Sequence, residues 1–452
     1  MHASHRFVTL LLLVAVSSAG CGLKMEQHYQ QMRPFMVEGN WNAAADFVEG
    51  VKEKFYGDEK NRVLYYMDMG YTLHMAKQYD RSQTFLTKAA DSIQDLWTES
   101  ISSHLSALVG TDNSLPYQGE DFEKVMVHVY GALNFALQNN YESARIEARI
   151  VTDKLELYNS KYEESKNVYR DDAFIRWFSG WLRETEGGVQ ALNDAKIDYH
   201  NAVDLYRQQY TPHYATPLPS FVVQDLFRTA EASGIMDTVE DIREAYPDLT
   251  WPKQSEIAGQ GQVLFIHQNG ESPHKIDRYI EAQAGDDKIR VAFPELVTKP
   301  KRITTARMTI EGTALSTQTK LMQPITKIAV QNLSDRMGRI MTKAIATAVA
   351  KYLAAKGAQK AGQSVGGTAG TVMQLGGAIF GAVSYAVEEA DKRSWITLPS
   401  EIWAGRLFLD PGVYTIKVDF MDANGRTVKT RSYPGIEVTA GGRAMINDRT
   451  FM

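Results

Sequence analysis

Asn139-Asn140-Tyr141-Glu142-Ser143-Ala144 joins a short polar turn to an aromatic residue and, three positions later, a small residue. Ala148 and Val151 continue this spacing, which places one stripe of small and apolar side chains along a helix. The arrangement recurs at Gly39-Asn40-Trp41 before Ala44, at Lys77-Gln78-Tyr79 before Ser82, Leu86 and Ala89, and at Tyr199 before Ala202 and Tyr206. The repeated stretch predicts helices that begin after tight turns and pack closely on one another.

This helical pattern extends from residue 24 to about residue 248, without a β-patterned segment. In two repeats the preceding helix also fits, because Gly70 and Ala132 lie equally far ahead of Tyr79 and Tyr141. Such units resemble the tetratricopeptide repeat, a helix–turn–helix unit of about 34 residues that stacks into a solenoid. The aromatic residues are unequally spaced, so the array is expected to be irregular or to contain extra helices. A generic α-helical bundle with an aromatic core is the alternative.

The pattern changes beyond Tyr246-Pro247, where Trp251-Pro252 indicates a linker. Asn269-Gly270 is a hairpin-turn signal, and residues 413–421 alternate apolar and polar side chains as a half-buried strand does. Residues 263–267, 288–293 and 302–310 are also expected to be strands. A small antiparallel β-sandwich is the simplest architecture for this part of the chain.

A second helical block interrupts these strands. Pro324 opens it, residues 357–370 are rich in Gly, Ala and Ser and predict a bend, and residues 371–387 predict a second apolar helix. The run 361–387 has no charged residue and contains seven glycines. It is interpreted either as a hairpin that enters a membrane or as a buried or interface hairpin. Its strongly apolar part, residues 372–387, is shorter than the roughly 20 residues needed to span a bilayer, which favours the second interpretation.

The expected fold is therefore α+β: an N-terminal all-α, tetratricopeptide-like solenoid, followed by a small antiparallel β-sandwich with an inserted helical hairpin. The expected divisions are a signal peptide over 1–20, the helical domain over 21–250, the first part of the β domain over 251–323, the hairpin over 324–392, and the second part of the β domain over 393–452.

Cys21 is the only cysteine and follows a basic start, an apolar stretch over residues 7–16 and the small residues Ser17-Ser18-Ala19-Gly20. This order is typical of a secretory signal. A cysteine directly after the small residues resembles a bacterial lipobox, so Cys21 is the expected lipidation site. Several acyl chains hold a soluble domain on a membrane where one would not. A plain secretory signal with a chance cysteine is the alternative.

The sequence argues against nucleic-acid binding, because the formal net charge is -5 and no dense Lys/Arg run occurs. It contains no phosphate-binding glycine loop, serine nucleophile elbow or zinc-binding histidine motif. Acylation of Cys21 would leave no cysteine nucleophile. We therefore expect no enzyme activity, no catalytic residue, no cofactor and no metal. An envelope enzyme that acts on peptidoglycan or polysaccharide is a minor alternative.

Several short stretches carry a family resemblance: Tyr117-x-Gly119-x-x-x-Glu123, Asn140 to Arg145 continuing to Glu147 and Arg149, the Asn269-Gly270 turn, and Ala390-Asp391-Lys392-Arg393-Ser394-Trp395 followed by Leu398-Pro399. They resemble a poorly characterised family of bacterial envelope lipoproteins with tetratricopeptide-like repeats and a C-terminal β domain. The resemblance implies lipoprotein status and this architecture, and it implies no enzyme activity. It also hints at a place near the cell-wall synthesis machinery.

The function expected from the sequence is a lipid-anchored periplasmic scaffold or adaptor that binds envelope protein partners through its helical repeats. The helical domain would offer a concave groove to the partner. The β domain with its hairpin would mediate assembly, which includes a possible homo-oligomer. Gly22 after the lipidated cysteine, in place of aspartate, favours the periplasmic face of the outer membrane. The alternative is an export- or pore-associated outer-membrane component whose Gly-rich hairpin inserts in a membrane or oligomerises.

Overall fold

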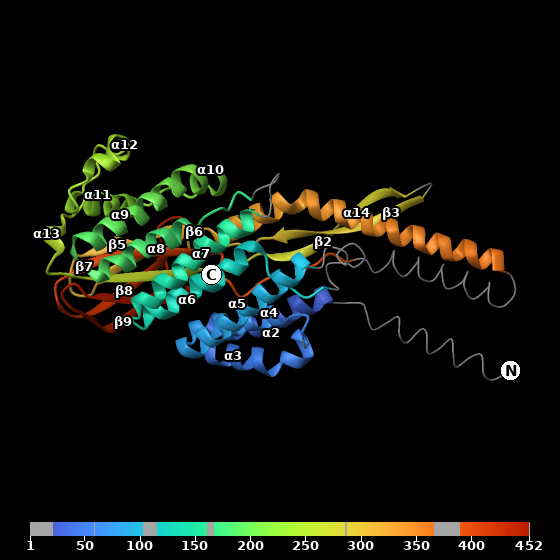
Figure 1. Cartoon of the computed structure of the whole chain (residues 1–452). Coiled ribbons are helices and arrows are strands. Elements are labelled where there is room, and N and C mark those ends of the chain that lie inside the picture. The colour runs from blue at the N-terminus through green and yellow to red at the C-terminus, as the bar shows by residue number, and fades with distance from the viewer. Residues whose placement is uncertain are drawn as a thin grey trace.

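The computed structural model describes residues 21–57, 59–102, 115–160, 167–284, 287–365 and 389–451 (Figure 1). The expected signal peptide over 1–20 and the expected second hairpin helix over 371–387 lie outside the described residues. Within them the fold is mixed α+β, with helices in the N-terminal half and sheets in the C-terminal half.

The N-terminal half is helical as far as Ile257, and β1 begins at Gly261. Its α-helices are α2 (Cys21–Glu38), α3 (Trp41–Gly50), α4 (Arg62–Met75), α5 (Tyr79–Ser102), α6 (Asp121–Leu137), α7 (Tyr141–Ser160), α8 (Ala173–Arg183), α9 (Gly188–Leu205), α10 (Thr211–Tyr214), α11 (Ser220–Ala232), α12 (Glu240–Ala245) and α13 (Gln254–Ile257). Short π-helical or 3₁₀ segments occupy Lys52–Tyr56, Glu184–Glu186, Tyr206–Tyr210 and Met236–Val239. Consecutive helices pack as pairs, α4 on α5, α6 on α7 and α8 on α9.

The turns that precede α3, α5 and α7 share one backbone geometry. Lys77 and Asn139 have φ of 61° and 60°, a left-handed conformation that favours glycine, and Gly39 has φ of 79° at the matching position. In each turn the next residue donates its N–H to a carbonyl five residues back, at 2.8 to 3.0 Å (Asn40 to Phe35, Gln78 to Leu73, Asn140 to Phe135). These turns start the helices at Trp41, Tyr79 and Tyr141, as predicted.

The small residues of the repeated stretch are buried where the helix pairs meet. Ala44, Ser82 and Ala144 have no exposed surface. A Cβ at Gly70 on α4 would lie 2.5 Å from a methyl of Leu86 on α5, so a larger residue there would force Leu86 to shift. The expectation for Tyr199 is wrong, because this residue lies inside α9 and does not follow a turn.

The C-terminal half contains β1 (Gly261–Asn269), β2 (His274–Ala284), β3 (Asp287–Val297), β4 (Thr305–Ile310), β5 (Ser316–Gln318), β6 (Lys320–Gln323), β7 (Glu401–Leu409), β8 (Gly412–Met421), β9 (Thr427–Val438) and β10 (Arg443–Thr450). Among the described residues they form a first sheet in the order β10-β1-β7-β6, a second sheet in the order β5-β4-β8-β9, and the β2–β3 ribbon. The two sheets enclose a core that includes Phe265, Met308 and Phe420. The expectation of purely antiparallel strands is wrong, because β1 and β10 pair in parallel.

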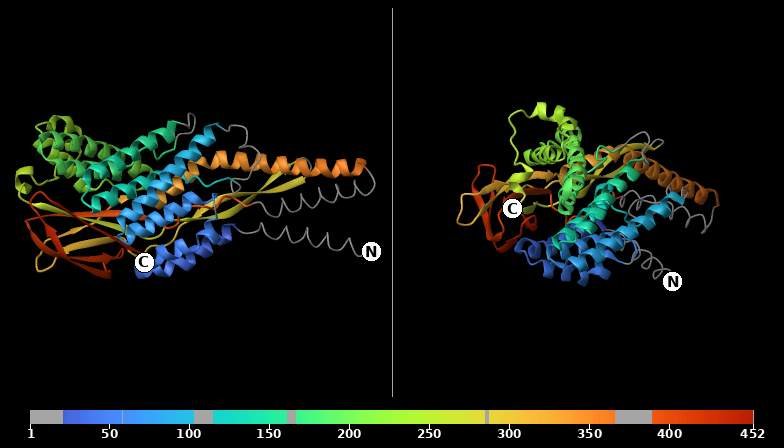
Figure 2. Two further views of the ribbon diagram at one scale, coloured as in Figure 1. Left: turned by 60° about the horizontal axis from the view of Figure 1, so that its bottom comes forward. Right: turned by 60° about the vertical axis from the view of Figure 1, so that its left-hand side comes forward.

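The first sheet also packs on the helices, so the described part of the chain is built in four layers (Figure 2). Helices α5, α7 and α9 cover α4, α6 and α8, which in turn cover the first sheet. Every residue of β1 is buried. Gln268 accepts hydrogen bonds from the hydroxyls of Tyr71 on α4 and Tyr130 on α6, at 2.8 and 2.9 Å. Gln262 accepts one from the Trp181 indole on α8, at 2.8 Å.

This layering corrects the expectation of a groove left open for a partner. The helix face formed by α4, α6 and α8 is occupied by the protein's own β1. The physical reason is that β1 has buried residues on both faces, Val263 and Phe265 towards the second sheet and Leu264 and Ile266 towards the helices. A strand of this kind needs a layer on each side.

Helix α14 (Ile325–Val365) is inserted between β6 and β7 and begins directly after Pro324, as predicted. Its distal part packs on the ribbon through Ile289, Val291 and Ala348. We call the ribbon and residues 337–365 of α14 the arm; it projects from the end of the body at which α2 begins (Figures 1 and 2). The expected bend over 357–370 is wrong as far as Val365, because the helix continues through Gly357. Neighbouring Ala, Lys and Gln residues have high helix propensity.

Candidate functional site

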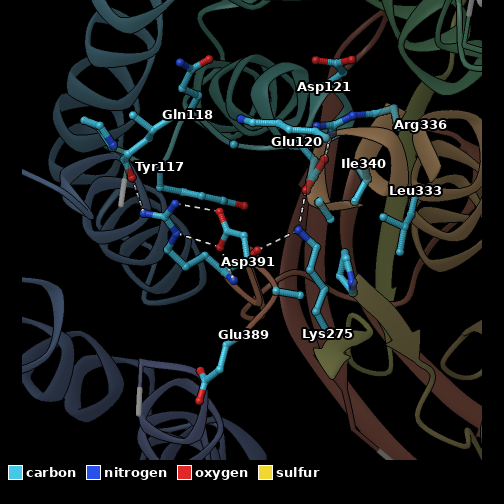
Figure 3. Close-up of a pocket in the computed structure, with 18 of the residues that line it drawn as sticks. Tyr117, Gln118, Glu120, Asp121, Lys275, Leu333, Arg336, Ile340, Glu389 and Asp391 are labelled. Atoms are coloured by element: carbon cyan, nitrogen blue, oxygen red, sulfur yellow. Dashed lines mark hydrogen bonds and ion pairs between the residues drawn. The ribbon is translucent and has the colours of Figure 1, made fainter. Parts of the chain in front are cut away.

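A cavity of about 330 Å³ lies where the helical layers meet the arm (Figure 3). Its walls come from the end of α5, the start of α6, the ribbon, α14 and the segment before β7. The described residues that line it are Trp97, Leu115, Pro116, Tyr117, Gln118, Gly119, Glu120, Asp121, Lys124, Lys275, Ala292, Pro294, Leu333, Arg336, Ile340, Lys343, Ala344, Thr347, Glu389, Ala390, Asp391 and Arg393. We call this cavity the arm cleft.

The wall formed by the start of α6 is fixed by Glu123. One carboxylate oxygen, Oε2, accepts the N–H of Glu120 at 2.9 Å, which satisfies a backbone donor that the first helical turn leaves unpaired. The same oxygen accepts the hydroxyl of Tyr117, and Oε1 accepts the backbone N–H of Trp395 at 2.7 Å. Burial raises the pKa of Glu123, against the charge of Lys275 and these hydrogen bonds. Glu123 thus joins two segments that are remote in the sequence.

Arg393 holds the opposite side of this wall. Its guanidinium donates to both oxygens of Asp391, at 2.9 Å from Nε and 2.7 Å from Nη2, and to the carbonyl of Leu115 at 2.9 Å. It also lies over the Tyr117 ring, 5.2 Å from the centroid. Burial acts to raise the pKa of Asp391, but the hydrogen bonds and charge of Arg393 outweigh it and the pKa is lowered. Asp391 is therefore an ionised, paired carboxylate.

Glu120 links the three structural units that meet at the cleft. Its carboxylate forms ion pairs with Lys275 of β2 and with Arg336 of α14 (Figure 3). Lys275 also donates to the carbonyl of Arg393 at 2.9 Å. The two cations offset the free-energy cost of partly burying the Glu120 carboxylate. This junction therefore fixes the arm relative to the helices.

Deeper in the cleft, Lys124 bonds Asp121 at 3.1 Å and lies over the Tyr158 ring, 4.9 Å from the centroid. Asn167 donates to the second oxygen of Asp121 at 3.0 Å. Leu333 and Ile340 supply the apolar wall on α14. The cleft thus offers paired charges of both signs, aromatic edges and aliphatic side chains, an arrangement suited to binding a polypeptide segment.

The sequence motifs and the cleft overlap in part. Tyr117, Gly119, Glu123 and the 390–395 stretch, noted for their resemblance, come together here. The sequence did not indicate Lys275 and Arg336 as cleft residues, because nothing in their local sequence distinguishes them from other surface cations. The expected lipidation site, Cys21, is the first residue of α2.

In the ranges that the structure describes, no group of three or more His, Cys, Asp and Glu side chains is arranged to hold a metal ion. In the same ranges, no helix combines the length and apolar character needed to cross a bilayer.

No family model matches the chain, and no curated protein is similar to it. Among solved structures it is similar to the Rap conjugation gene regulator of the plasmid pLS20 in complex with a Phr peptide, at 14% sequence identity and a TM-score of 0.28. The match covers 48% of this chain and 52% of that chain, so it spans about half of each. A likeness at this score supports no inference about fold or function.

Proposed function

We propose that the protein is a lipid-anchored periplasmic scaffold or adaptor of the bacterial cell envelope, held by Cys21, and that it binds a protein partner at the arm cleft. The observation that carries the proposal is the contact of Glu123 with both Tyr117 and Trp395. It brings together, at one cleft, two of the stretches that resemble envelope lipoproteins. Residues that contact one partner are expected to lie together at one surface, even when they are remote in the sequence.

The helix pairs support a role in protein binding. Three turns of one geometry and small residues at the helix contacts are features of a tetratricopeptide-like array, and such arrays present binding surfaces without any catalytic group. Because β1 fills the face of α4, α6 and α8, the proposed partner surface is the arm cleft instead of that face.

The position of Cys21 supports the anchored topology. It begins α2 at the end of the body from which the arm projects (Figure 1). An anchor there would hold the cleft close to the membrane, within reach of membrane-bound partners such as the cell-wall synthesis machinery. The alternative of an export- or pore-associated component is favoured by one observation, the projection of α14 beyond the body.

A comparison of two variants on α14 tests the proposal. Ile340→Glu places a carboxylate in the cleft lining, whereas Val330→Glu places one on an exposed position of the same helix outside that lining. The lipidated chain and both variants serve as bait with detergent-solubilised membranes. The wild type and Val330→Glu should recover the same partner, and Ile340→Glu should lose it. Equal recovery by all three would reject the cleft as the partner site.

A further inference from the structure

The charge of the chain is unevenly distributed along it. Residues 337–387 contain no Asp or Glu, and they carry the five basic residues Arg339, Lys343, Lys351, Lys356 and Lys360. The whole chain has a net charge of -5, so the remainder is more acidic than the whole. A basic segment on an acidic protein indicates an anionic partner.

The structure places this basic segment on a projecting element. The distal part of α14 packs on the ribbon through Ala348 and its neighbours, which contact the buried side chains of Ile289 and Val291. The arm then leaves the body on the side where α2 begins (Figure 2). The hairpin over residues 274–297 carries five acids (Asp277, Glu281, Asp286, Asp287, Glu295) and four bases (Lys275, Arg278, Lys288, Arg290), a net charge of -1. The positive charge of the arm therefore comes from its helix.

Side chains suited to a bilayer interface lie on the same arm. Leu353 on α14 is 59% exposed and Tyr279 on the ribbon is 41% exposed. The Arg290 guanidinium stacks on the Tyr279 ring, 3.5 Å from the centroid. Aromatic and basic side chains with an apolar body and a polar end are enriched at the level of lipid headgroups.

We infer that the arm docks on the headgroup region of an anionic bilayer through the basic distal part of α14. The inference deepens the proposed function, because a lipid at Cys21 would bring this end of the molecule to the membrane. Acyl chains and a basic patch together anchor a protein more firmly than either alone, and each Lys or Arg near an anionic surface strengthens binding roughly five-fold. The arm lies on the surface and does not span it.

Vesicle binding by the mature chain tests this, with Cys21→Ser to remove the acylation site. The probe is phosphatidylcholine vesicles with and without phosphatidylglycerol, and the readout is co-sedimentation. Binding should require phosphatidylglycerol and weaken at high salt, since ions screen exposed charges. The combined variant Arg339→Gln, Lys351→Gln and Lys356→Gln should bind roughly 100-fold more weakly.

The matched control is Lys320→Gln, Lys417→Gln and Arg426→Gln, which removes three exposed bases from β6, β8 and the β8–β9 turn, all outside the arm. It should bind as the wild type does, and circular dichroism should show both triple variants folded. Equal binding to neutral and anionic vesicles would overturn the inference in favour of insertion. Absence of binding at low salt would overturn it in favour of an acidic protein partner. Neither lipidation nor partner capture enters this assay, so its failure is separable from failure of the proposed function.

Discussion

Glu123 accepts the backbone N–H of Trp395 at 2.7 Å, although 272 positions separate the two residues in the sequence. Its other carboxylate oxygen accepts the Tyr117 hydroxyl and the N–H of Glu120. A single buried carboxylate therefore fixes the start of α6, the segment before it and the segment before β7. The arm cleft exists because these three meet.

Glu123→Gln should destabilise the protein by about 1–3 kcal/mol, because an amide has one acceptor oxygen, and its nitrogen would face either the donors at Oε2 or the Trp395 N–H at Oε1. Urea unfolding measures the change. Glu142→Gln, at an exposed position on α7, is the control and should change the free energy of unfolding by less than about 0.5 kcal/mol. Equal effects of both variants would contradict the role assigned to Glu123.

Ala144→Glu should destabilise by several kcal/mol, because it puts a charge at a position with no exposed surface between α6 and α7. Ile146→Glu is the matched control on the same helix, where the side chain is 56% exposed. Thermal unfolding of both variants gives the comparison. An unchanged melting temperature for Ala144→Glu would mean that the repeat register is wrong.

Arg449→Lys should destabilise by about 2–4 kcal/mol. Arg449 is buried and donates to the carbonyls of Gly270 and Leu398, each at 3.0 Å, and to the Tyr71 hydroxyl at 2.5 Å. A lysine ammonium cannot reproduce this planar fork, so buried acceptors would stay unpaired. Arg426→Lys, in an exposed turn, should be neutral in the same denaturation experiment. Loss of stability in both would point to a general effect of replacing arginine.

Acid should destabilise the protein partly through His74. Burial lowers the pKa of His74 to about 4, although its hydrogen bond to Asn134 acts in the opposite direction. His74 therefore takes up a proton near pH 6.5 in the unfolded chain but only near pH 4 in the folded chain. The free energy of unfolding falls as the pH falls between these values. The loss should be about 3 kcal/mol.

His74→Gln should remove this part of the pH dependence. The free energy of unfolding, measured by urea titration between pH 7 and pH 4, should fall less steeply in this variant than in the wild type. His213→Gln, at an exposed position, should keep the wild-type slope. A His74→Gln slope equal to that of the wild type would show that another group carries the acid sensitivity.

Local turn chemistry could be predicted from the sequence, and long-range pairing could not. Lys77 and Asn139 end their helices at the positions that the polar turns indicated. By contrast, Gln262 and Gln268 are polar residues of the kind expected on a solvent-facing side of a strand. Both are buried, and tyrosine and tryptophan side chains of the helices donate hydrogen bonds to them. The local sequence of β1 does not show that the helices cover one of its faces and the second sheet the other. The burial of the α4, α6 and α8 face under β1 could therefore not be predicted.

The candidate site was predictable in the same partial way. The stretches around Glu123 and Trp395 were recognisable one by one, but a single sequence gives no sign that they meet. Glu120, Lys275 and Arg336 belong to three separate elements and become a cluster only when α14 crosses the start of α6. Helix periodicity describes each element and leaves such crossings undetermined.

Lipid anchoring at Cys21 is the central claim, since the proposed position of the cleft near a membrane and the proposed orientation of the arm both depend on it. The most direct measurement is incorporation of labelled palmitate by bacterial cells that express the full chain, compared with the Cys21→Ser variant. The account predicts label in the wild type and none in the variant. Label retained by Cys21→Ser, or absent from the wild type, would contradict it.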